Sequence, residues 1–228
     1  CFVGETAQLK EGMHLLAPIL SFEISEAGAK IAVKKSQDGT LSVSNTEICY
    51  AEPIHFYRAL GLLCEHWNEG EFCIRETPCF DTNGMMLDVC QGNDVMKVEH
   101  VKNMLCRMAI MGLNTFYLYM EDSFEVPEEP YFGYLRGRYS EEELREIDRF
   151  AEKLGITVIP CIQTLAHLMD ALKWYPYAEF KDDDDTLMVG DERSYTFVSH
   201  LLQAIVKPFR TKRIHIGMDE AWKLGQGN

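Results

Sequence analysis

The sequence predicts an α/β fold in which strands alternate with helices, preceded by a small α+β layer. Two observations support this prediction. From Phe80 onward, short apolar stretches of strand length alternate with longer stretches whose apolar residues recur at helical spacing. Before Phe80, several alternating stretches are followed by one helical stretch. Because strands that alternate with helices pair in parallel, we expect the second part to hold a parallel sheet covered by helices.

The first part, residues 1–79, predicts a small α+β domain. Three stretches have the pattern of antiparallel strands: LLAPILSFEI, KIAVKKS and TLSVSNTEICY. Asp38 and Gly39 indicate a turn between the last two. In residues 52–70, the following apolar residues recur at helical spacing: Phe56, Leu60, Leu63 and Trp67. We therefore expect a helix that ends at Gly70 and covers the strands.

The second part, residues 80–228, predicts four strands: GMMLDVC, NTFYLYM, ITVIPCIQ and RIHIGMD. The helical stretches between them include VMKVEHVKNMLCRMAIMG, EEELREIDRFAEKLG and SYTFVSHLLQAIVKPF. Ser140 with Glu143 forms a capping-box pattern, and Gly155 is a stop signal. Four such units form either a small open sheet or the first half of an eight-unit barrel, which needs about 250 residues. Since the sequence ends soon after the fourth strand, we expect a truncated piece of a longer enzyme.

Composition limits the kinds of partner. The net charge of -14 disfavours nucleic acid and anionic membranes. No apolar run reaches the length of a membrane span, and the start lacks the pattern of a secretory signal. The eight cysteines include no CxxC pair, which favours reduced, buried thiols in a cytoplasmic protein, with disulfides as the alternative.

Polar side chains follow all four predicted strands. In chain order they are Asp88 and Gln91, Glu121 and Asp122, Gln163 and His167, and Asp219 and Glu220. Solvated loop charge explains any one of these, but the ends of parallel strands meet at a common mouth. The four ends together therefore predict a functional site.

The fourth strand places two acids side by side. Alternation puts His215, Gly217 and Asp219 on one face, which we expect to be the barrel interior. The opposite face, which we expect to be covered by helices, holds Ile214, Ile216 and Met218. The alternative is a polar layer with a capping acid at a helix start.

Adjacent acids do not match the usual retaining glycosidase. There, an acid and a carboxylate nucleophile lie about 5 to 5.5 Å apart on opposite sides of the scissile bond. A different division of labour fits Asp219 and Glu220 better. One acid protonates the leaving oxygen, while its neighbour orients a nucleophile that belongs to the substrate.

HIGMDE resembles the H-x-G-x-D-E pattern of the family 20 glycoside hydrolases, the β-N-acetylhexosaminidases. Four further stretches occur in the order and spacing of the family's intracellular exo-N-acetylglucosaminidase branch: GMMLDV, MGLNTFYLYMED, EPYFGYLRGRYS and IPCIQTLAHL. The resemblance covers about residues 80–222. It implies a (β/α)8 TIM-type barrel, of which about the first four βα units are present, after a small non-catalytic domain.

The resemblance also implies roles for residues. Glu220 would be the general acid/base, and Asp219 would hold the substrate's 2-acetamido group, whose oxygen attacks the anomeric carbon to form an oxazolinium ion. Asp122 and His167 would form a hydrogen-bonded pair behind Glu220 that modulates its proton transfer, and His215 would also support the site.

Asp88, Gln91 and Trp222 would bind substrate, with simple packing as the alternative for Trp222. Gln91 stands where family members usually have an arginine, so it lacks the charge and the five-donor fork that would bind sugar hydroxyls.

The leading hypothesis is an exo-acting hydrolase of glycans with a terminal N-acetylhexosamine, without cofactor or metal. Two alternatives stay open. The chain is a catalytically incomplete half-barrel that pairs through an exposed edge, for example as a homodimer. Otherwise it is a metallohydrolase that uses His167, His215, Asp122 and Asp219.

Overall fold

The structure is a computed structural model that describes residues 1–91 and 95–227. By its internal contacts the chain divides into two compact units. Unit 1 comprises residues 1–85, 99–116 and 149–157, and unit 2 comprises residues 86–98, 117–148 and 158–228. Within the described ranges, no helix is both long and apolar enough to cross a membrane.

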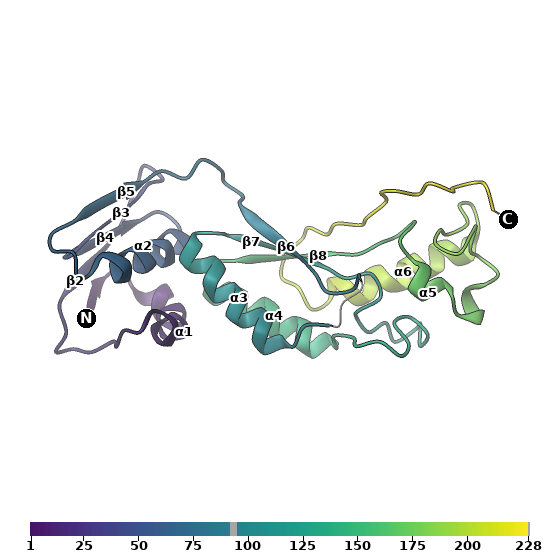
Figure 1. Cartoon of the computed structure of the whole chain (residues 1–228), viewed down its shortest axis with the longest axis horizontal. Coiled ribbons are helices and arrows are strands. Elements are labelled where there is room, and N and C mark those ends of the chain that lie inside the picture. The colour runs from purple at the N-terminus through teal and green to yellow at the C-terminus, as the bar shows by residue number, and fades with distance from the viewer. Residues whose placement is uncertain (92–94, 228) are drawn as a thin grey trace. The chain divides into compact units, whose positions relative to one another are not determined.

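The elements in chain order are β1 (Phe2–Gly4), η1 (Ala7–Leu9), α1 (Lys10–Leu20), β2 (Ile31–Lys35), β3 (Leu41–Ser44), β4 (Glu47–Tyr50), α2 (Pro53–His66), β5 (Cys73–Glu76), β6 (Gly84–Asp88), α3 (Val98–Met111), β7 (Thr115–Tyr119), α4 (Glu141–Lys153), β8 (Thr157–Cys161), α5 (Met169–Leu172), η2 (Tyr175–Tyr177) and α6 (Glu192–Val206). Figure 1 labels most of them along the chain.

Unit 1 contains a mixed five-stranded sheet in the order β1-β2-β4-β3-β5. β3 is antiparallel to β4 and β5, but β2 pairs in parallel with β1 and β4. β2 and β3 are therefore not neighbours in the sheet, so the prediction that these two stretches are antiparallel strands on either side of the turn at Asp38 and Gly39 is wrong for this pair. Only Asn45 and Thr46 separate β3 from β4, so these two strands form the tight hairpin instead. The turn at Asp38 is local, because its side chain accepts hydrogen bonds from the Thr40 backbone at 3.1 Å and from Ser36 Oγ at 2.6 Å.

The first predicted strand, residues 15–24, is also wrong. Most of it belongs to the helix α1. The signal that decides the conformation is the spacing of Leu9, Met13 and Leu16, which repeat at helical intervals and are buried. The helix ends at Ser21, whose left-handed backbone (φ 55°) lets the following Phe22 N–H donate to the Ala17 carbonyl at 3.1 Å.

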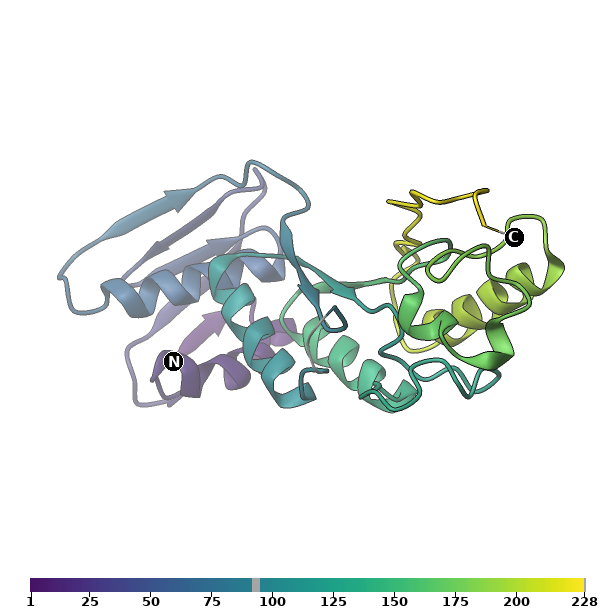
Figure 2. The ribbon, with the colours of Figure 1, turned by 45° about the vertical axis from the view of Figure 1, so that its right-hand side comes forward.

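The predicted covering helix is present as α2, which contacts β3, β4 and α1. Figures 1 and 2 show it lying along one face of the sheet. Phe56, Leu60 and Leu63 are buried on its inner face, as the spacing predicts. α1 approaches α2 closely at Gly12, where an added Cβ would lie 2.1 Å from the Tyr57 hydroxyl oxygen.

The second sheet has the order β6-β7-β8. Backbone bonds from Thr157 N to Asn114 O (2.9 Å) and from Met120 N to Cys161 O (2.8 Å) advance along β7 and β8 in the same direction. These two strands are therefore parallel, as predicted. The helices α3 and α4 follow β6 and β7.

The predicted start of α4 is confirmed. The Ser140 N–H donates to Glu143 Oε2 at 2.8 Å, and the Glu143 N–H donates to Ser140 Oγ at 3.3 Å. This reciprocal pair is the capping box that the two residues predicted.

The fourth predicted strand is not a regular strand. His215 makes one isolated parallel bridge to Cys161, and the described residues 213–218 form no further ladder. Gly217 adopts a left-handed φ of 51°, which interrupts extended backbone. Ile216 and Met218 are 44% and 57% exposed, so the helical cover predicted for their side chains is absent among the described residues.

The cysteines are all free thiols. Cys106 and Cys161 are buried, and burial raises the pKa of their thiols to about 11 and about 12. Cys73 and Cys79 are exposed, so the prediction of buried thiols is wrong for these two.

Candidate active site

An open cavity of about 660 Å³ in unit 2 gathers carboxylate and histidine side chains. Six of the predicted site residues line it: Asp88, Gln91, His167, His215, Asp219 and Glu220. A cavity of about 470 Å³ in unit 1 differs, because apolar side chains such as Phe2, Leu60 and Leu63 form much of its lining. The predicted chemistry therefore converges on the cavity in unit 2.

The segment that bears the two acids is held beside the end of β8. The Ile162 N–H donates to the His215 carbonyl at 2.9 Å, and the Thr164 N–H donates to the Gly217 carbonyl at 3.1 Å. A Cβ at Gly217 would lie 2.4 Å from the Ile162 carbonyl oxygen, so only glycine permits this approach. The chain then turns at Glu220, whose φ is 53°.

His167 lies against both acids. Its Nε2 is 3.3 Å from Glu220 Oε2 and 3.8 Å from Asp219 Oδ2. The backbone of His167 is also left-handed, with φ 55°, which costs free energy in a residue with a Cβ. The fold thus brings together three residues that the sequence analysis placed at two different strand ends.

The same three side chains could hold a metal ion, because one ligand atom from each lies within 4.8 Å of the others. This set differs from the predicted metallohydrolase set, since it includes Glu220 and neither Asp122 nor His215 is part of it. The distance of 3.3 Å between His167 Nε2 and Glu220 Oε2 equally suits proton transfer between an acid and an imidazole.

Asp219 is stabilised as a carboxylate. Its own backbone N–H is the main cause that lowers the pKa of its side chain, and the Gln163 amide adds a hydrogen bond of 3.3 Å from Nε2 to Oδ1. The positive charge available on His167 and His215 acts in the same direction. The Asp219 side chain therefore stays negatively charged down to a lower pH than an ordinary aspartate does.

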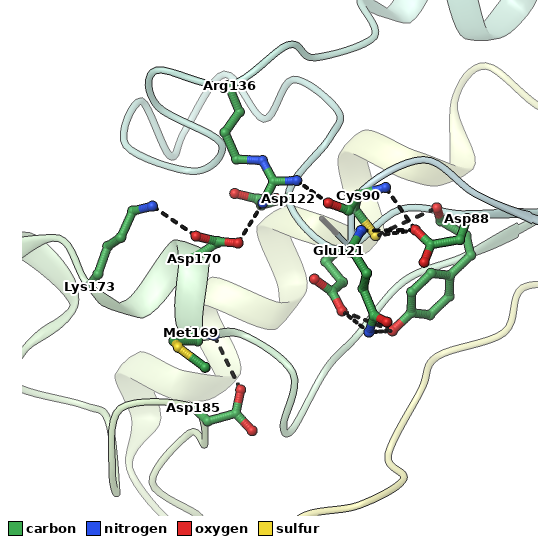
Figure 3. A network of polar contacts seen from close by, with 11 residues as sticks. Asp88, Cys90, Glu121, Asp122, Arg136, Met169, Asp170, Lys173 and Asp185 are labelled. Atoms are coloured by element: carbon green, nitrogen blue, oxygen red, sulfur yellow. Dashed lines mark hydrogen bonds and ion pairs between the residues drawn. The ribbon is translucent and has the colours of Figure 1, made fainter. Parts of the chain in front are cut away.

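Asp88 and Gln91 form a turn after β6. Asp88 Oδ1 accepts from the Cys90 N–H at 2.8 Å and from the Gln91 N–H at 2.9 Å. The Gln91 amide donates to Glu121 Oε1 at 2.7 Å, which joins the ends of β6 and β7. Figure 3 shows these contacts at one side of a larger polar network.

Asp122 is buried, and Arg136 provides its opposite charge at 3.2 Å from Nη1 to Oδ1. No described hydrogen bond joins Asp122 to His167, although the resemblance implied that pair. Arg136 also reaches the Asp170 carboxylate at 2.5 Å and the Cys90 carbonyl, as Figure 3 shows. Sequence reasoning missed Arg136, for which the one available signal is a cation within an acidic loop.

Replacing Arg136 with Met should lower the free energy of unfolding by about 3 kcal/mol at pH 7, because Asp122 would then be a buried charge without a counter-charge. Burial raises the pKa of Asp122, and Arg136 opposes that shift. A folded-state pKa above the unfolded value means that the folded protein binds more protons, so stability falls as pH rises through this window. The Arg136→Met penalty should therefore shrink on going from pH 7 toward pH 4.

Urea unfolding of four proteins measures this coupling: wild type, Arg136→Met, Asp122→Asn and the double variant. The double variant should recover part of the loss, since it no longer has an unpaired buried charge at position 122. Equal losses for the Arg136→Met change in both backgrounds would contradict the assigned pair.

Trp222 is 78% exposed and does not line the cavity. Two further residues are important there: Tyr119, which the sequence analysis did not name, and Gln163, which it placed at the third strand end without assigning it a role. Tyr119 lines the cavity at the end of β7, and Gln163 contacts Asp219 after β8. Strand alternation could have placed Tyr119 on the same face as Thr115 and Tyr117.

Comparison with known proteins gives a consistent result. The model of the glycosyl hydrolase family 20 catalytic domain matches residues 80–226. A β-hexosaminidase of Porphyromonas gingivalis is 29% identical over 177 residues, which cover 66% of this chain and 22% of that protein. Human hexosaminidase D is 28% identical over 137 residues, which cover 58% of this chain and 28% of that protein. The chain thus spans less than a third of these curated relatives.

Solved structures show the same fold. A family 20 exo-β-N-acetylglucosaminidase from Vibrio harveyi, in complex with N-acetylglucosamine, superposes with a TM-score of 0.82 at 23% identity. The match covers 99% of this chain and 44% of that one. A β-N-acetylhexosaminidase from Streptomyces coelicolor has a TM-score of 0.79 at 20% identity, and the match covers 99% of this chain and 56% of that one.

Proposed function

The chain belongs to glycosyl hydrolase family 20, and on that basis we propose that it contains the acid/base residues of an exo-β-N-acetylhexosaminidase. The substrate is a glycan with N-acetylglucosamine or N-acetylgalactosamine at its non-reducing end. One observation supports this most strongly. Asp219 and Glu220 both line the cavity in unit 2, and His167 contacts both carboxylates.

In the proposed reaction, the nucleophile belongs to the substrate. The carbonyl oxygen of the 2-acetamido group attacks the anomeric carbon as Glu220 protonates the leaving oxygen. The product of this step is a cyclic oxazolinium ion, and the aglycone departs with the proton. Glu220, now ionised, then takes a proton from water as the water attacks the anomeric carbon, which reopens the ring with retention of configuration.

Asp219 makes this division of labour reasonable. Positive charge develops on the acetamido nitrogen during ring closure, and an ionised carboxylate that accepts its N–H stabilises that charge. The lowered pKa of Asp219 keeps the carboxylate available at neutral pH. His167, whose Nε2 lies 3.3 Å from Glu220 Oε2, holds the Glu220 carboxyl group in position before and after it gives up its proton.

We propose that β6, β7, β8 and residues 213–218 are the first four strand positions of a (β/α)8 barrel. The family match begins at residue 80, which supports a catalytic domain from there onward and a small α+β domain over residues 1–79. The superposition on the Vibrio harveyi structure supports the same arrangement.

Hydrolysis of two aryl glycosides tests the function. The polypeptide encoded by the whole reading frame that contains these 228 residues should hydrolyse an aryl N-acetyl-β-glucosaminide at least about 10³-fold faster, in kcat/KM, than the matching β-glucoside. The reason is that the glucoside lacks the internal nucleophile. A thiazoline analogue of the oxazolinium ion should bind more tightly than N-acetylglucosamine.

Equal hydrolysis of both glycosides would overturn the mechanism. No hydrolysis together with no thiazoline binding would favour the alternative, a half-barrel without turnover. Metal dependence of the rate, removed by a chelator, would favour the metallohydrolase alternative instead.

A further inference from the structure

A row of hydrogen bonds links the end of β7 to Asp219. The Tyr119 hydroxyl lies 3.0 Å from Glu121 Oε1, and Gln163 Nε2 lies 2.9 Å from the same hydroxyl oxygen. Gln163 Nε2 also lies 3.3 Å from Asp219 Oδ1. All four side chains belong to unit 2. Proton donors and acceptors therefore run without a break from a carboxylate in the polar network of Figure 3 to the acid in the cavity.

Glu121 fixes which group donates and which accepts in each hydrogen bond of this row. An ionised carboxylate only accepts hydrogen bonds, so the Tyr119 hydroxyl must donate to it. The Tyr119 oxygen is then left as an acceptor, and it takes hydrogen bonds from the Gln163 amide nitrogen at 2.9 Å and from the Gln91 amide nitrogen at 3.4 Å. That nitrogen has two hydrogens, and its second one is directed to Asp219. Tyr119 thus selects which end of the Gln163 amide faces Asp219.

The rest of Gln163 has little freedom. The residue is 1% exposed, and its Oε1 has no hydrogen-bond partner among the described residues. A Cβ on Gly217 would lie 2.3 Å from that oxygen, so the amide fills the space that the glycine leaves. An unpartnered buried oxygen favours a flip of the amide, and the bond to Tyr119 opposes the flip.

We propose that Tyr119 is a positioning residue for Asp219, acting through Gln163 and oriented by Glu121. The inference rests on the proposed function, in which Asp219 receives the acetamido N–H of the substrate. The Gln163 amide holds Oδ1, which leaves Oδ2 to accept that N–H. A flipped amide would instead present its oxygen to Asp219 and turn the carboxylate away.

Three other ionisable residues lie near Asp219 and must be considered in any pH effect. His167 Nε2 lies 3.8 Å from Oδ2, His215 lines the same cavity, and Glu220 is the next residue. A variant of Tyr119 leaves all three in place. A change in the titration of Asp219 would therefore report the loss of the Gln163 donor.

The test compares Tyr119→Phe with Tyr175→Phe, which removes the same hydroxyl from a side chain that is 89% exposed. For an aryl N-acetyl-β-glucosaminide, Tyr119→Phe should lower kcat about tenfold and change KM less than about twofold. The acid limb of its pH profile should move to higher pH, because Asp219 loses a donor that favours the carboxylate. Tyr175→Phe should match wild type in all three measurements.

Carbon-13 NMR titration of the Asp219 carboxyl group gives a readout that does not need turnover. Its pKa should rise in Tyr119→Phe and stay unchanged in Tyr175→Phe. If wild type lacks hydrolase activity but this pKa rises, the proposed function fails and the positioning role stands. If the pKa, kcat and acid limb of Tyr119→Phe all equal those of Tyr175→Phe, the positioning role is overturned.

A second variant covers the case in which Tyr119→Phe does not fold. Gln163→Glu is nearly isosteric and replaces the donor to Asp219 with a group that accepts. It should raise the Asp219 pKa and move the acid limb in the same direction. An unchanged pKa for Asp219 in Gln163→Glu would equally overturn the proposal.

Discussion

Replacing Glu220 with Gln should lower kcat for a glycoside with a poor leaving group by about 10²- to 10⁴-fold. The amide has nearly the shape of the acid but no proton to give, so the leaving oxygen departs as an unstabilised anion. His167 would keep a polar neighbour of nearly the same shape at the position of Glu220. Steady-state kinetics with an alkyl or chitobiose-like aglycone measures the loss.

A comparison of two leaving groups distinguishes a general acid from a residue with only a structural role. An activated aryl aglycone such as dinitrophenolate leaves without protonation, so Glu220→Gln should recover most of its first-step rate with it. Glu128→Gln, the same chemical change at an exposed loop position, should leave both substrates unaffected. A loss that is equal for both aglycones would contradict the role of Glu220 as general acid.

Replacing Asp219 with Asn should lower kcat by about 10²- to 10³-fold, because the acetamido nitrogen loses the negative charge that stabilises ring closure. Unlike the loss in Glu220→Gln, this loss should persist with the activated aglycone. Ring closure still needs the acetamido group in place, however good the leaving group is. Stopped-flow measurement of the first turnover gives the rate of that step.

Asp184→Asn provides the matched control for Asp219→Asn. Asp184 lies in the acidic loop, with a side chain that is 87% exposed and pairs with Lys181. Its replacement should leave kcat unchanged. Full recovery of Asp219→Asn with the activated aglycone would contradict the assigned role, since that pattern belongs to the proton donor.

The pH dependence follows from the same residues. Because the pKa of Asp219 is lowered, its carboxylate stays charged over the pH range in which an ordinary aspartate titrates, and it becomes neutral only at more acidic pH. Asp122 behaves in the opposite way, since burial raises its pKa and Arg136 limits the rise. The two aspartates thus differ in titration through their surroundings and not through residue type.

Sequence periodicity predicted most of the helices correctly, because each depends on residues a few positions apart. Residues 141–155 show this well: Ser140 and Glu143 close the capping box, and Gly155 ends the turn after α4. Residues 15–24 failed because a run of consecutive apolar residues fits a strand as well as a helix. The buried apolar face that identifies α1 as a helix begins before this stretch, at Leu9.

Residues 213–218 failed for a different reason. Their alternation of apolar and polar residues is typical of a strand, yet a strand exists only where a neighbour continues the hydrogen-bond ladder. Here β8 supplies one bridge, at Cys161, one more backbone bond runs from Thr164 to Gly217, and Gly217 leaves extended backbone. Asp219 and Glu220 directly follow this position and line the cavity.

The sequence by itself determined the features that depend on neighbours along the chain. These are the caps and faces of the helices, the polar residues at successive strand ends, and the adjacency of Asp219 and Glu220. The tertiary structure alone decided which distant groups meet. Asp122 pairs with Arg136 and not with His167, and the Tyr119 hydroxyl is linked to Asp219 by hydrogen bonds through Gln163. Hydrogen bonds and ion pairs act over a few ångströms, so their partners are set by how strands and loops pack, which periodicity along one chain does not contain.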